Sequence, residues 1–242
     1  MSFDKQEFRS ALLLGAEAMG LILEEQVVEG FLSFAVYVVK GNTRLNLTRI
    51  TDEREMAVKH FLDSLAVTLV PRFCEGIRFV DIGTGAGFPG IPLKMYDPEK
   101  ECTLLDSVGK KVAFLQEAIE YLGLSGIEGV NMRAEELAIT KREYFDGVVC
   151  RGVGSVGEVA ELSMPLLRVG GIMVIMKGPE KEQVDRALLL EELGGACSPK
   201  DQVEYELPFG LGKRRLIVIE KVKQTKQKYP RRAGMARKRP LF

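Results

Sequence analysis

The segment 79–90, with the sequence FVDIGTGAGFPG, constrains the fold of this chain more than any other part. It predicts a buried strand with an acid near its end, Asp81, then a glycine-rich turn and a helix. Glycine permits positive φ and lets the backbone approach a ligand without an intervening Cβ. A strand, a glycine-rich turn and a helix together form a cradle for a nucleotide. The segment therefore predicts an α/β fold with a nucleotide-like ligand at this strand end.

Glycine spacing alone leaves the kind of nucleotide open. The dinucleotide fingerprint Gly-x-Gly-x-x-Gly fails from Gly83, because its last position is Phe88, but it fits from Gly85. Two acids sharpen the interpretation, Asp81 before the glycines and Asp106 after the next apolar run. This arrangement resembles the cofactor loop of S-adenosylmethionine-dependent methyltransferases. Their ligand carries no pyrophosphate, and carboxylates can face its amino and ribose groups.

The composition is that of an ordinary globular protein and disfavours several classes. Of the 242 residues, 46% are hydrophobic and 28% are charged, which is typical of soluble domains. No apolar run approaches the ~20 residues of a membrane-spanning helix, and the charged N-terminus is unlike a signal peptide. The four cysteines stand far apart without a C-x-x-C pair, which disfavours zinc or disulfides. We therefore expect a cytoplasmic protein with reduced thiols and no metal.

Strand and helix patterns alternate after the glycine loop. This alternation predicts a Rossmann-like, mostly parallel, doubly wound sheet of seven strands. Right-handed crossovers place the strand ends, and with them the ligand, on one edge. Strands are expected at 79–82, 101–106, 127–132, 145–150 and 172–177, helices at 110–122, 155–167 and 179–193, and a closing antiparallel pair at 203–207 and 214–220.

The chain is expected to have three regions. Residues 1–72 should form an N-terminal helical extension that packs on the core, because apolar residues recur there near helical spacing. Thr51 or Asp52 can cap a helix within it. Residues 73–222 are expected to form the cofactor-binding domain, and residues 223–242 a basic tail.

The glycine loop supplies the first candidate cofactor contacts. Gly83 and Gly85 would let the backbone pass beneath the ligand, although a plain tight turn has the same composition. Asp81 can face a cationic group. Phe88 can pack on the cofactor or on the core, and the proline after it suits the first turn of a helix.

Two further strand ends carry acids. Asp106 ends the second strand, where a carboxylate can accept both ribose hydroxyls; capping of the next helix is the alternative. Ala134 and Glu135 follow the third strand, where an N–H group and a carboxylate could read the adenine edge. An exposed acidic helix start is the alternative for this pair.

The fourth strand leads into Arg151, where a substrate-facing group is expected. Methyltransferases of exocyclic amines resemble one another in an Asn/Asp-Pro-Pro-aromatic motif here, which this chain lacks. Cys150 is near the place of a nucleophile for pyrimidine carbon, but without a neighbouring proline or acid it is interpreted as a core residue. Arg151 and Lys177, at the end of the fifth strand, are candidate substrate positioners. The lone histidine, His60, is interpreted as structural and is expected to change charge near neutral pH.

The charges are unevenly placed although the net charge is zero. From Lys221 to the end every charged side chain is basic, so the rest of the chain is net acidic. Such a tail favours a polyanionic partner, with a solvated, disordered terminus as the alternative. Its cations can bind phosphates, and Tyr229 could stack on a base. The candidate nucleic-acid contacts are Lys228, Arg231, Arg232, Arg237 and Lys238.

Three segments together go beyond the generic fold. They are 46–48 (NLT) followed by 59–64 (KHFLDS), the loop 81–90, and 228–234 (KYPRRAG). In this order they resemble the bacterial ribosomal RNA small-subunit methyltransferase G family, once called glucose-inhibited division protein B, over nearly the whole chain. The resemblance implies methyl transfer from S-adenosylmethionine to N7 of one guanine in small-subunit (16S) ribosomal RNA. It implies cofactor binding by Gly83, Phe88, Ala134, Glu135 and Arg151, and Asp106 matches the general ribose position.

This chemistry agrees with the lack of an evident catalytic constellation. Guanine N7 has a free lone pair and no proton to remove, so positioning carries most of the rate. One alternative is a methyltransferase with a small-molecule or protein substrate, and another is a non-enzymatic RNA-binding module. Deletion of the chain from Lys226 onward distinguishes the small-molecule or protein alternative from RNA methylation. Loss of RNA methylation with intact cofactor binding would support RNA as the substrate. Nothing in the sequence calls for a dimer, and a monomer is expected.

Overall fold

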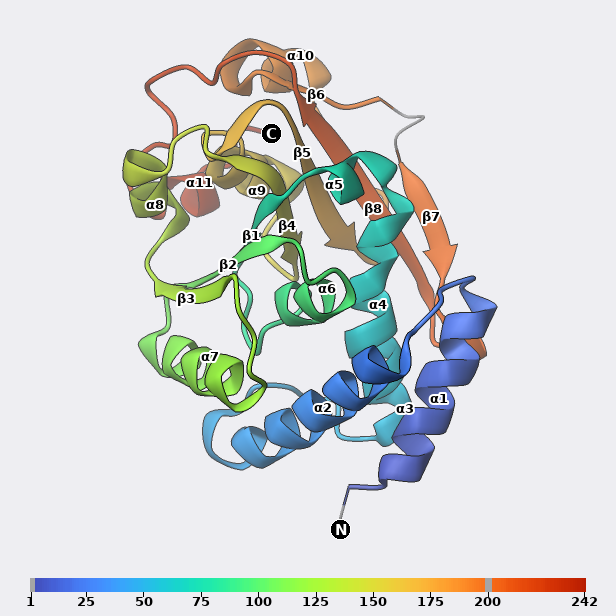
Figure 1. The fold of residues 1–242 in the computed structure, drawn as a ribbon. Helices are drawn as coiled ribbons and strands as arrows, with labels where there is room; N and C mark the ends of the chain where they lie inside the picture. Colours follow the sequence, from blue (N-terminus) through green and yellow to red (C-terminus); the bar gives the residue numbers. More distant parts are fainter. Residues whose placement is uncertain (1–2, 199–201) are drawn as a thin grey trace.

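One sheet runs through the centre of the molecule, of which the structure, a computed structural model, describes residues 3–198 and 202–242 (Figure 1). The strand order is β3-β2-β1-β4-β5-β8-β6, and β7 also pairs with β8. Strands β1 to β5 are parallel, and β8 is antiparallel to β5. The strands are β1 (Arg78–Ile82), β2 (Glu101–Asp106), β3 (Ile127–Asn131), β4 (Phe145–Arg151), β5 (Leu167–Lys177), β6 (Gly195–Ala196), β7 (Val203–Glu206) and β8 (Lys213–Lys221).

This arrangement confirms the predicted Rossmann-like α/β sheet. It has one strand more than expected, because β6 and β7 pair with opposite ends of β8 and share one edge position. Strand β5 also begins earlier than expected. Gly170 and Gly171 lie inside β5, where the register with β4 shifts, and Gly170 takes a φ of 85°. These glycines therefore accommodate an irregular strand, and the preceding helix α9 (Val156–Ser163) already ends at Ser163.

Helices cover both faces of the sheet. On one face lie α6 (Gly90–Tyr96) and α7 (Gly109–Tyr121), whose apolar residues share a cluster with Phe79 and Leu104 of the sheet. The other face is covered by α8 (Ala134–Thr140) and α9, which share a second cluster with Val80. Among the described residues, no helix has the length and apolar character needed to cross a membrane.

The helix expected at 179–193 forms only in its second half. It begins as α10 (Arg186–Leu188) and continues as a π-helix, Leu189–Leu193. The side chain of Asp185 accepts the Leu188 N–H at 2.9 Å and so caps the helix at this point. Before the cap, Glu182 accepts the Val156 N–H at 2.9 Å and pairs with Lys177 at 2.7 Å, which ties this non-helical segment to α9 and β5.

The N-terminal helices pack on the same face as α6 and α7 (Figure 1). Their aromatic side chains Phe8, Phe31 and Phe34 surround Phe61, with ring centroids 5.0–6.0 Å apart. Asp52 caps α3 by accepting the Glu55 N–H at 2.8 Å, as the sequence predicted. The elements are α1 (Lys5–Ala18), α2 (Glu25–Leu45), α3 (Glu53–Met56), a π-helix (Ala57–Leu62), α4 (Asp63–Leu65), a 3₁₀ turn (Ala66–Leu69) and α5 (Pro71–Glu75).

The basic tail leaves β8 and crosses to the face of the sheet that α8 and α9 cover, opposite the face on which the N-terminal helices pack. It ends near α9 with the short helix α11 (Met235–Lys238), which lies beside α8 and α9 in Figure 1. Helix α11 packs on α9, and Tyr229 is buried in the second apolar cluster. The tail is thus attached to the body, which contradicts the alternative of a solvated, disordered terminus.

Candidate cofactor and substrate site

Asp81 anchors the glycine loop from below. Its side chain is fully buried, and its Oδ2 accepts the Thr84 hydroxyl at 2.6 Å and the Gly90 N–H at 2.9 Å. Burial raises the pKa of this carboxyl to about 6. Oδ1 is buried without a hydrogen-bond partner among the described residues. The geometry gives Asp81 a part in holding the loop against α6, and its predicted contact with the cofactor stays a prediction.

The loop above Asp81 requires glycine at two positions. Gly83 has a φ of 69° and Gly85 a φ of 60°, in the left-handed region that other residues rarely adopt. A Cβ at Gly83 would also lie 2.6 Å from Cγ2 of Val153, in the loop after β4. The close approach of Gly83 to Val153 therefore joins the ends of β1 and β4.

A pocket of about 170 Å³ lies at the ends of β1, β2 and β3. Four of the predicted cofactor residues line it: Gly83, Asp106, Ala134 and Glu135. Asp106 accepts the Val108 N–H through Oδ1 at 2.9 Å and the Gly85 N–H through Oδ2 at 3.0 Å. Each of its oxygens keeps a second lone pair, which suits the two ribose hydroxyls of an adenosine. These residues fit the ribose and adenine of S-adenosylmethionine, and we call the hollow the adenosine pocket.

Glu135 has a partner that the sequence did not predict. Its Oε1 accepts the N–H of Gly234, in the basic tail, at 2.8 Å. Gly234, Ala236 and Arg237 line the adenosine pocket together with the strand ends. The tail thus takes part in the pocket for which Glu135 was predicted.

Arg151 lies outside the adenosine pocket, in a polar cluster with the N-terminal helices. Its Nη1 donates to Asp63 Oδ2 at 3.0 Å and to the Lys59 carbonyl oxygen at 2.9 Å. Its Nη2 is 3.2 Å from Nδ1 of His60. Asp63, only 4% exposed, also accepts the hydroxyl of Tyr205 at 2.7 Å. Arg151 therefore links β4 to the π-helix and to α4, and Asp63 continues the cluster to Tyr205 of β7.

His60 belongs to this site, although sequence reasoning placed it far from the glycine loop. Its ring stacks on Phe88 with centroids 4.6 Å apart, and Phe88 itself is buried against the N-terminal helices. Burial and the charge of Arg151 lower the pKa of His60 to about 3. The expectation that His60 changes charge near neutral pH is therefore wrong, because its surroundings penalise the charged ring.

The hydrogen bonds of His60 also assign its tautomer. A guanidinium only donates, so Nδ1, facing Arg151, must be the unprotonated acceptor. Nε2 then carries the proton and donates to Oγ1 of Thr48 at 2.7 Å. Both ring nitrogens are engaged, and neither is free to take a proton from a substrate.

A second hollow, of about 480 Å³, opens beside Arg151 and contains both candidate positioners. Lys177 lines it and donates to the Gly154 carbonyl oxygen at 2.5 Å while pairing with Glu182 at 2.7 Å. Val153 lines this hollow and contacts Gly83 of the adenosine pocket. The two hollows therefore meet at Gly83 and Val153, and we call the second one the substrate pocket.

Sequence reasoning missed three residues of the polar cluster at the substrate pocket: Asp63, Tyr205 and Arg214. Arg214 lines the substrate pocket and its Nε lies 3.8 Å from Asp63 Oδ1. These residues come from α4, β7 and β8, and no spacing pattern connects them. The one available signal was the position of Asp63 inside the segment 59–64, which carries part of the family resemblance.

Cys150 and the tail cations have clear structural settings. Cys150 is fully buried in the sheet, and burial raises the pKa of its thiol, in agreement with a core residue. Of the tail cations, Lys228 pairs with Glu192 at 2.6 Å and Arg231 with Glu161 at 2.5 Å. The side chains of Arg232, Arg237 and Lys238 are exposed.

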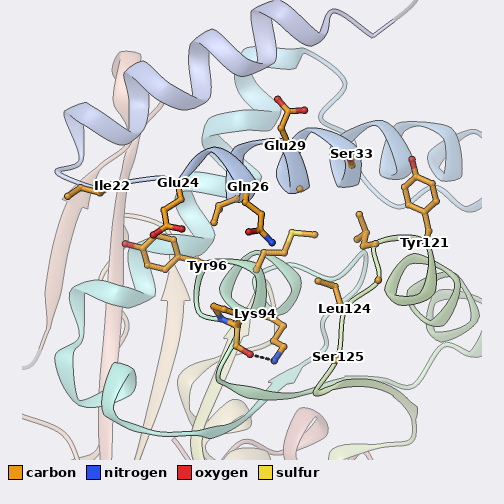
Figure 2. A pocket seen from close by; sticks show the side chains of 16 residues that line it. Ile22, Glu24, Gln26, Glu29, Ser33, Lys94, Tyr96, Tyr121, Leu124 and Ser125 are labelled. Atoms are coloured by element: carbon orange, nitrogen blue, oxygen red, sulfur yellow. Dashed lines mark hydrogen bonds between the residues drawn. The ribbon is translucent and has the colours of Figure 1, made fainter.

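A larger hollow, of about 1030 Å³, lies away from the strand ends between α2, α6 and α7 (Figure 2). None of the predicted site residues lines it. Its one buried cation, Lys94, donates to the carbonyl oxygens of Pro98 and Lys100. This hollow shares no lining residue with the adenosine pocket or the substrate pocket and lies apart from both.

Comparison with known proteins agrees with this geometry. Residues 28–208 match the family model of the rRNA small subunit methyltransferase G. The ribosomal RNA small subunit methyltransferase G of Alkaliphilus metalliredigens is 41% identical over 97% of this chain and 99% of its own length. That of Caldanaerobacter subterraneus subsp. tengcongensis is 42% identical over 98% of this chain and 100% of its own.

Solved structures support the fold at low sequence identity. A SAM-dependent methyltransferase from Aquifex aeolicus is similar with a TM-score of 0.50 and 17% identity, over 70% of this chain and 94% of that one. The [4+2]-cyclase SpnF gives a TM-score of 0.54 at 13% identity, over 83% of this chain and 97% of that one. Because a cyclase shares this fold, the fold alone does not assign the reaction. The match over nearly full length does, and this chain belongs to the rRNA small subunit methyltransferase G family and is a methyltransferase whose cofactor is S-adenosylmethionine.

Proposed function

We propose that this protein methylates N7 of a specific guanine in small-subunit (16S) ribosomal RNA. The relatives named above, similar over almost their whole length, are ribosomal RNA small subunit methyltransferases. The choice of N7 rests on one observation: the substrate pocket is lined by four cationic side chains, Lys59, Arg151, Lys177 and Arg214, and among the described residues it offers no available base.

Each group near this pocket that could serve as a base or nucleophile is already engaged. His60 is neutral with both nitrogens hydrogen-bonded. Asp63 is held by Arg151 and Tyr205. Cys150 is buried as a thiol in the sheet. Methylation of an exocyclic amine or of a pyrimidine carbon needs a proton acceptor or a nucleophile, whereas guanine N7 already presents its lone pair.

The chain then acts mainly by placing the base. S-adenosylmethionine would supply an electrophilic methyl group on its sulfonium. Gly83, Asp106, Ala134 and Glu135 would hold the adenosine part in the pocket they line. Arg151 and Lys177 would hold O6 of guanine or a neighbouring phosphate, so that N7 lies in line with the methyl group and water is excluded. Positioning of this kind supplies a large share of the rate when the reaction needs no proton transfer.

The RNA backbone would meet the exposed cations of the tail. Arg232 and Lys238 are exposed and make no side-chain ion pair among the described residues. Lys228 and Arg231 are tied to Glu192 and Glu161 and would have to leave these partners to bind a phosphate. We expect binding to weaken steeply with added salt, because phosphate contacts release counterions. A monomer acting in the cytoplasm on the RNA or on the small subunit is the form that we propose.

The test is methylation of 16S ribosomal RNA and of small subunits with cofactor labelled in the methyl group. We expect label in one guanine of the RNA, located by chain cleavage at N7-methylguanine. Arg151→Ala should lower the rate about 100-fold, while Arg168→Ala, whose partner Asp146 lies at the start of β4, serves as the control.

Other results would reassign the function. Label on another atom of the base would contradict the N7 proposal. Full activity of Arg151→Ala, with unchanged affinity for cofactor and RNA, would show that Arg151 does not position the base. Cofactor binding without methylation of either RNA substrate would favour a small molecule or protein as acceptor.

A further inference from the structure

The start of the basic tail is fixed to the body by buried and paired groups. Tyr229 is 5% exposed, and its hydroxyl donates to Glu192 Oε2 at 3.0 Å. Arg142 donates to the carbonyl oxygens of Tyr229 at 2.8 Å and Thr225 at 2.9 Å. Thr225 in turn donates to the Leu193 carbonyl oxygen at 2.7 Å. These contacts bring the chain across the second apolar cluster towards α9.

Arg231 makes the next attachment, to a buried acid. Glu161 of α9 has no exposed surface, and its carboxylate accepts Nε of Arg231 at 2.8 Å and Nη2 at 2.5 Å. The same carboxylate accepts the Arg231 backbone N–H at 3.0 Å. A carboxylate buried in this way needs its partner, because an unpaired buried charge is costly. The pair therefore sets where the chain goes after residue 231.

The chain then turns over the adenosine pocket. Gly234 has a φ of 78° and donates its N–H to Glu135, at the start of α8. Ala236 of α11 is 3% exposed. Gly234, Ala236 and Arg237 face the same hollow as Gly83 and Asp106. One wall of the pocket thus comes from the last residues of the chain, and the facing wall comes from the strand ends.

We propose that residues 231–238 are part of the cofactor-binding site and form its outer wall over the adenosine, with Arg237 in contact with the ligand and Arg231 as the residue that positions the wall. The hollow's volume of about 170 Å³ is below the ~300–1,000 Å³ of sites that hold a whole drug-sized ligand. It suits the adenosine part alone, while the methionine part continues past Gly83 towards the substrate pocket. A guanidinium can lie flat on an adenine ring, and the wall shields that ring from water.

This role changes what tail deletion means. If the tail served the polyanionic partner alone, its removal would leave cofactor binding intact. With residues 231–238 as a wall, removal weakens the binding of S-adenosylmethionine before any RNA is present. The inference rests on the cofactor and not on which RNA atom is methylated, so it stands or falls separately from the proposed N7 specificity.

The test is calorimetric titration of S-adenosylmethionine into the full-length protein without RNA. Arg231→Ala should weaken binding about tenfold or more, because it releases the wall, and Arg231→Lys should restore part of the loss. Arg239→Ala is the matched control, since this side chain is exposed and lies outside residues 231–238, and its cofactor affinity should equal that of the unmodified chain. Arg237→Ala should also weaken binding, by a smaller factor.

A chain that ends at Pro230 gives a second, independent measurement. It keeps Tyr229, Lys226 and Lys228 with their contacts to Glu192, so its fold can be checked by circular dichroism and thermal unfolding. We expect a folded protein with weakened cofactor binding. If this shortened chain and Arg231→Ala, both folded, bind S-adenosylmethionine as tightly as the full chain, the proposal is wrong.

A protease supplies a third readout on the unmodified protein. Trypsin cleaves after exposed Arg and Lys, and Arg232, Arg237 and Lys238 are exposed. Bound S-adenosylmethionine should slow cleavage after Arg237 and Lys238, because the ligand holds the wall in place. Equal cleavage with and without saturating cofactor would count against the contact with Arg237.

Discussion

Arg151 and Asp63 form an ion pair of 3.0 Å although 88 residues separate them in the chain. Their side chains are 19% and 6% exposed, so the pair lies largely out of water. It joins the end of β4 to α4 in the N-terminal helices. The substrate pocket therefore depends on contact between the methyltransferase sheet and the helical extension, and the first prediction concerns this pair.

Asp63→Asn keeps the shape of the side chain and removes its charge. We expect the free energy of unfolding to fall by about 3 kcal/mol, because a largely buried guanidinium loses its counter-charge. Tyr205→Phe is the matched control, since it removes only one hydrogen bond to the same carboxylate, and should cost about 1 kcal/mol. Urea unfolding at pH 7 measures both values. Equal, small losses for the two variants would show that the ion pair adds little.

The second prediction concerns acid and His60. The folded pKa of about 3 is below the unfolded value of about 6.5, so the unfolded chain binds more protons between these values. Stability contributed by neutral His60 is present above pH 6.5 and is lost as the pH falls. By pH 4 the loss should reach about 3 kcal/mol. His60→Gln should show a weaker fall in unfolding free energy between pH 7 and 4, and the same fall in both proteins would refute the assignment.

The third prediction concerns Asp81, whose titration should change stability with pH in the direction opposite to that of His60. Its folded pKa of about 6 exceeds the unfolded value of about 3.9, so the folded chain binds more protons between these values. The stability from protonated Asp81 is therefore present below pH 3.9 and is lost as the pH rises through 6. The free energy of unfolding of Asp81→Asn, relative to that of the unmodified protein, should rise by about 3 kcal/mol between pH 4 and 7. Unfolding by urea over this range checks the difference, and a constant difference would contradict the raised pKa.

The fourth prediction compares two glycines of one loop. Both Gly83→Ala and Gly85→Ala place a Cβ at positive φ, which should cost about 1 kcal/mol each. Only at Gly83 does the new atom also meet Val153, at 2.6 Å, whereas at Gly85 the nearest atom is 3.9 Å away. Gly83→Ala should therefore lose more stability and more cofactor affinity than Gly85→Ala. Thermal unfolding and calorimetry test this, and equal effects would show that the contact with Val153 is easily relieved.

The sheet and the cofactor loop could be predicted from local sequence. The apolar runs, the acids at strand ends and the glycines after β1 each act within a few residues, and Gly83, Asp106, Ala134 and Glu135 indeed line one pocket. Element ends were less predictable where a side chain decided them. Asp185 caps α10, and the glycines at 170 and 171 lie within a strand, because capping and strand pairing outweigh local helix preference.

The geometry around the substrate pocket and the place of the tail depend on contacts between elements that are far apart in the sequence. His60 was expected to titrate near neutral pH, but packing on Phe88 and next to Arg151 keeps it uncharged. The tail was interpreted as a solvated or nucleic-acid-binding segment from its charge alone. In the structure Glu161 and Glu135 draw it onto the adenosine pocket, and neither acid lies near the tail in sequence.

Local pattern was thus sufficient for the fold class and the cofactor loop, because strand and turn preferences depend on neighbouring residues, whereas the family came from the resemblance of three separate segments. Only the folded chain decided the protonation of His60, the partners of Arg151 and the place of residues 231–238. Burial and charge pairing depend on which surfaces meet in space, and these surfaces come from helices, strands and a tail that are far apart in the sequence.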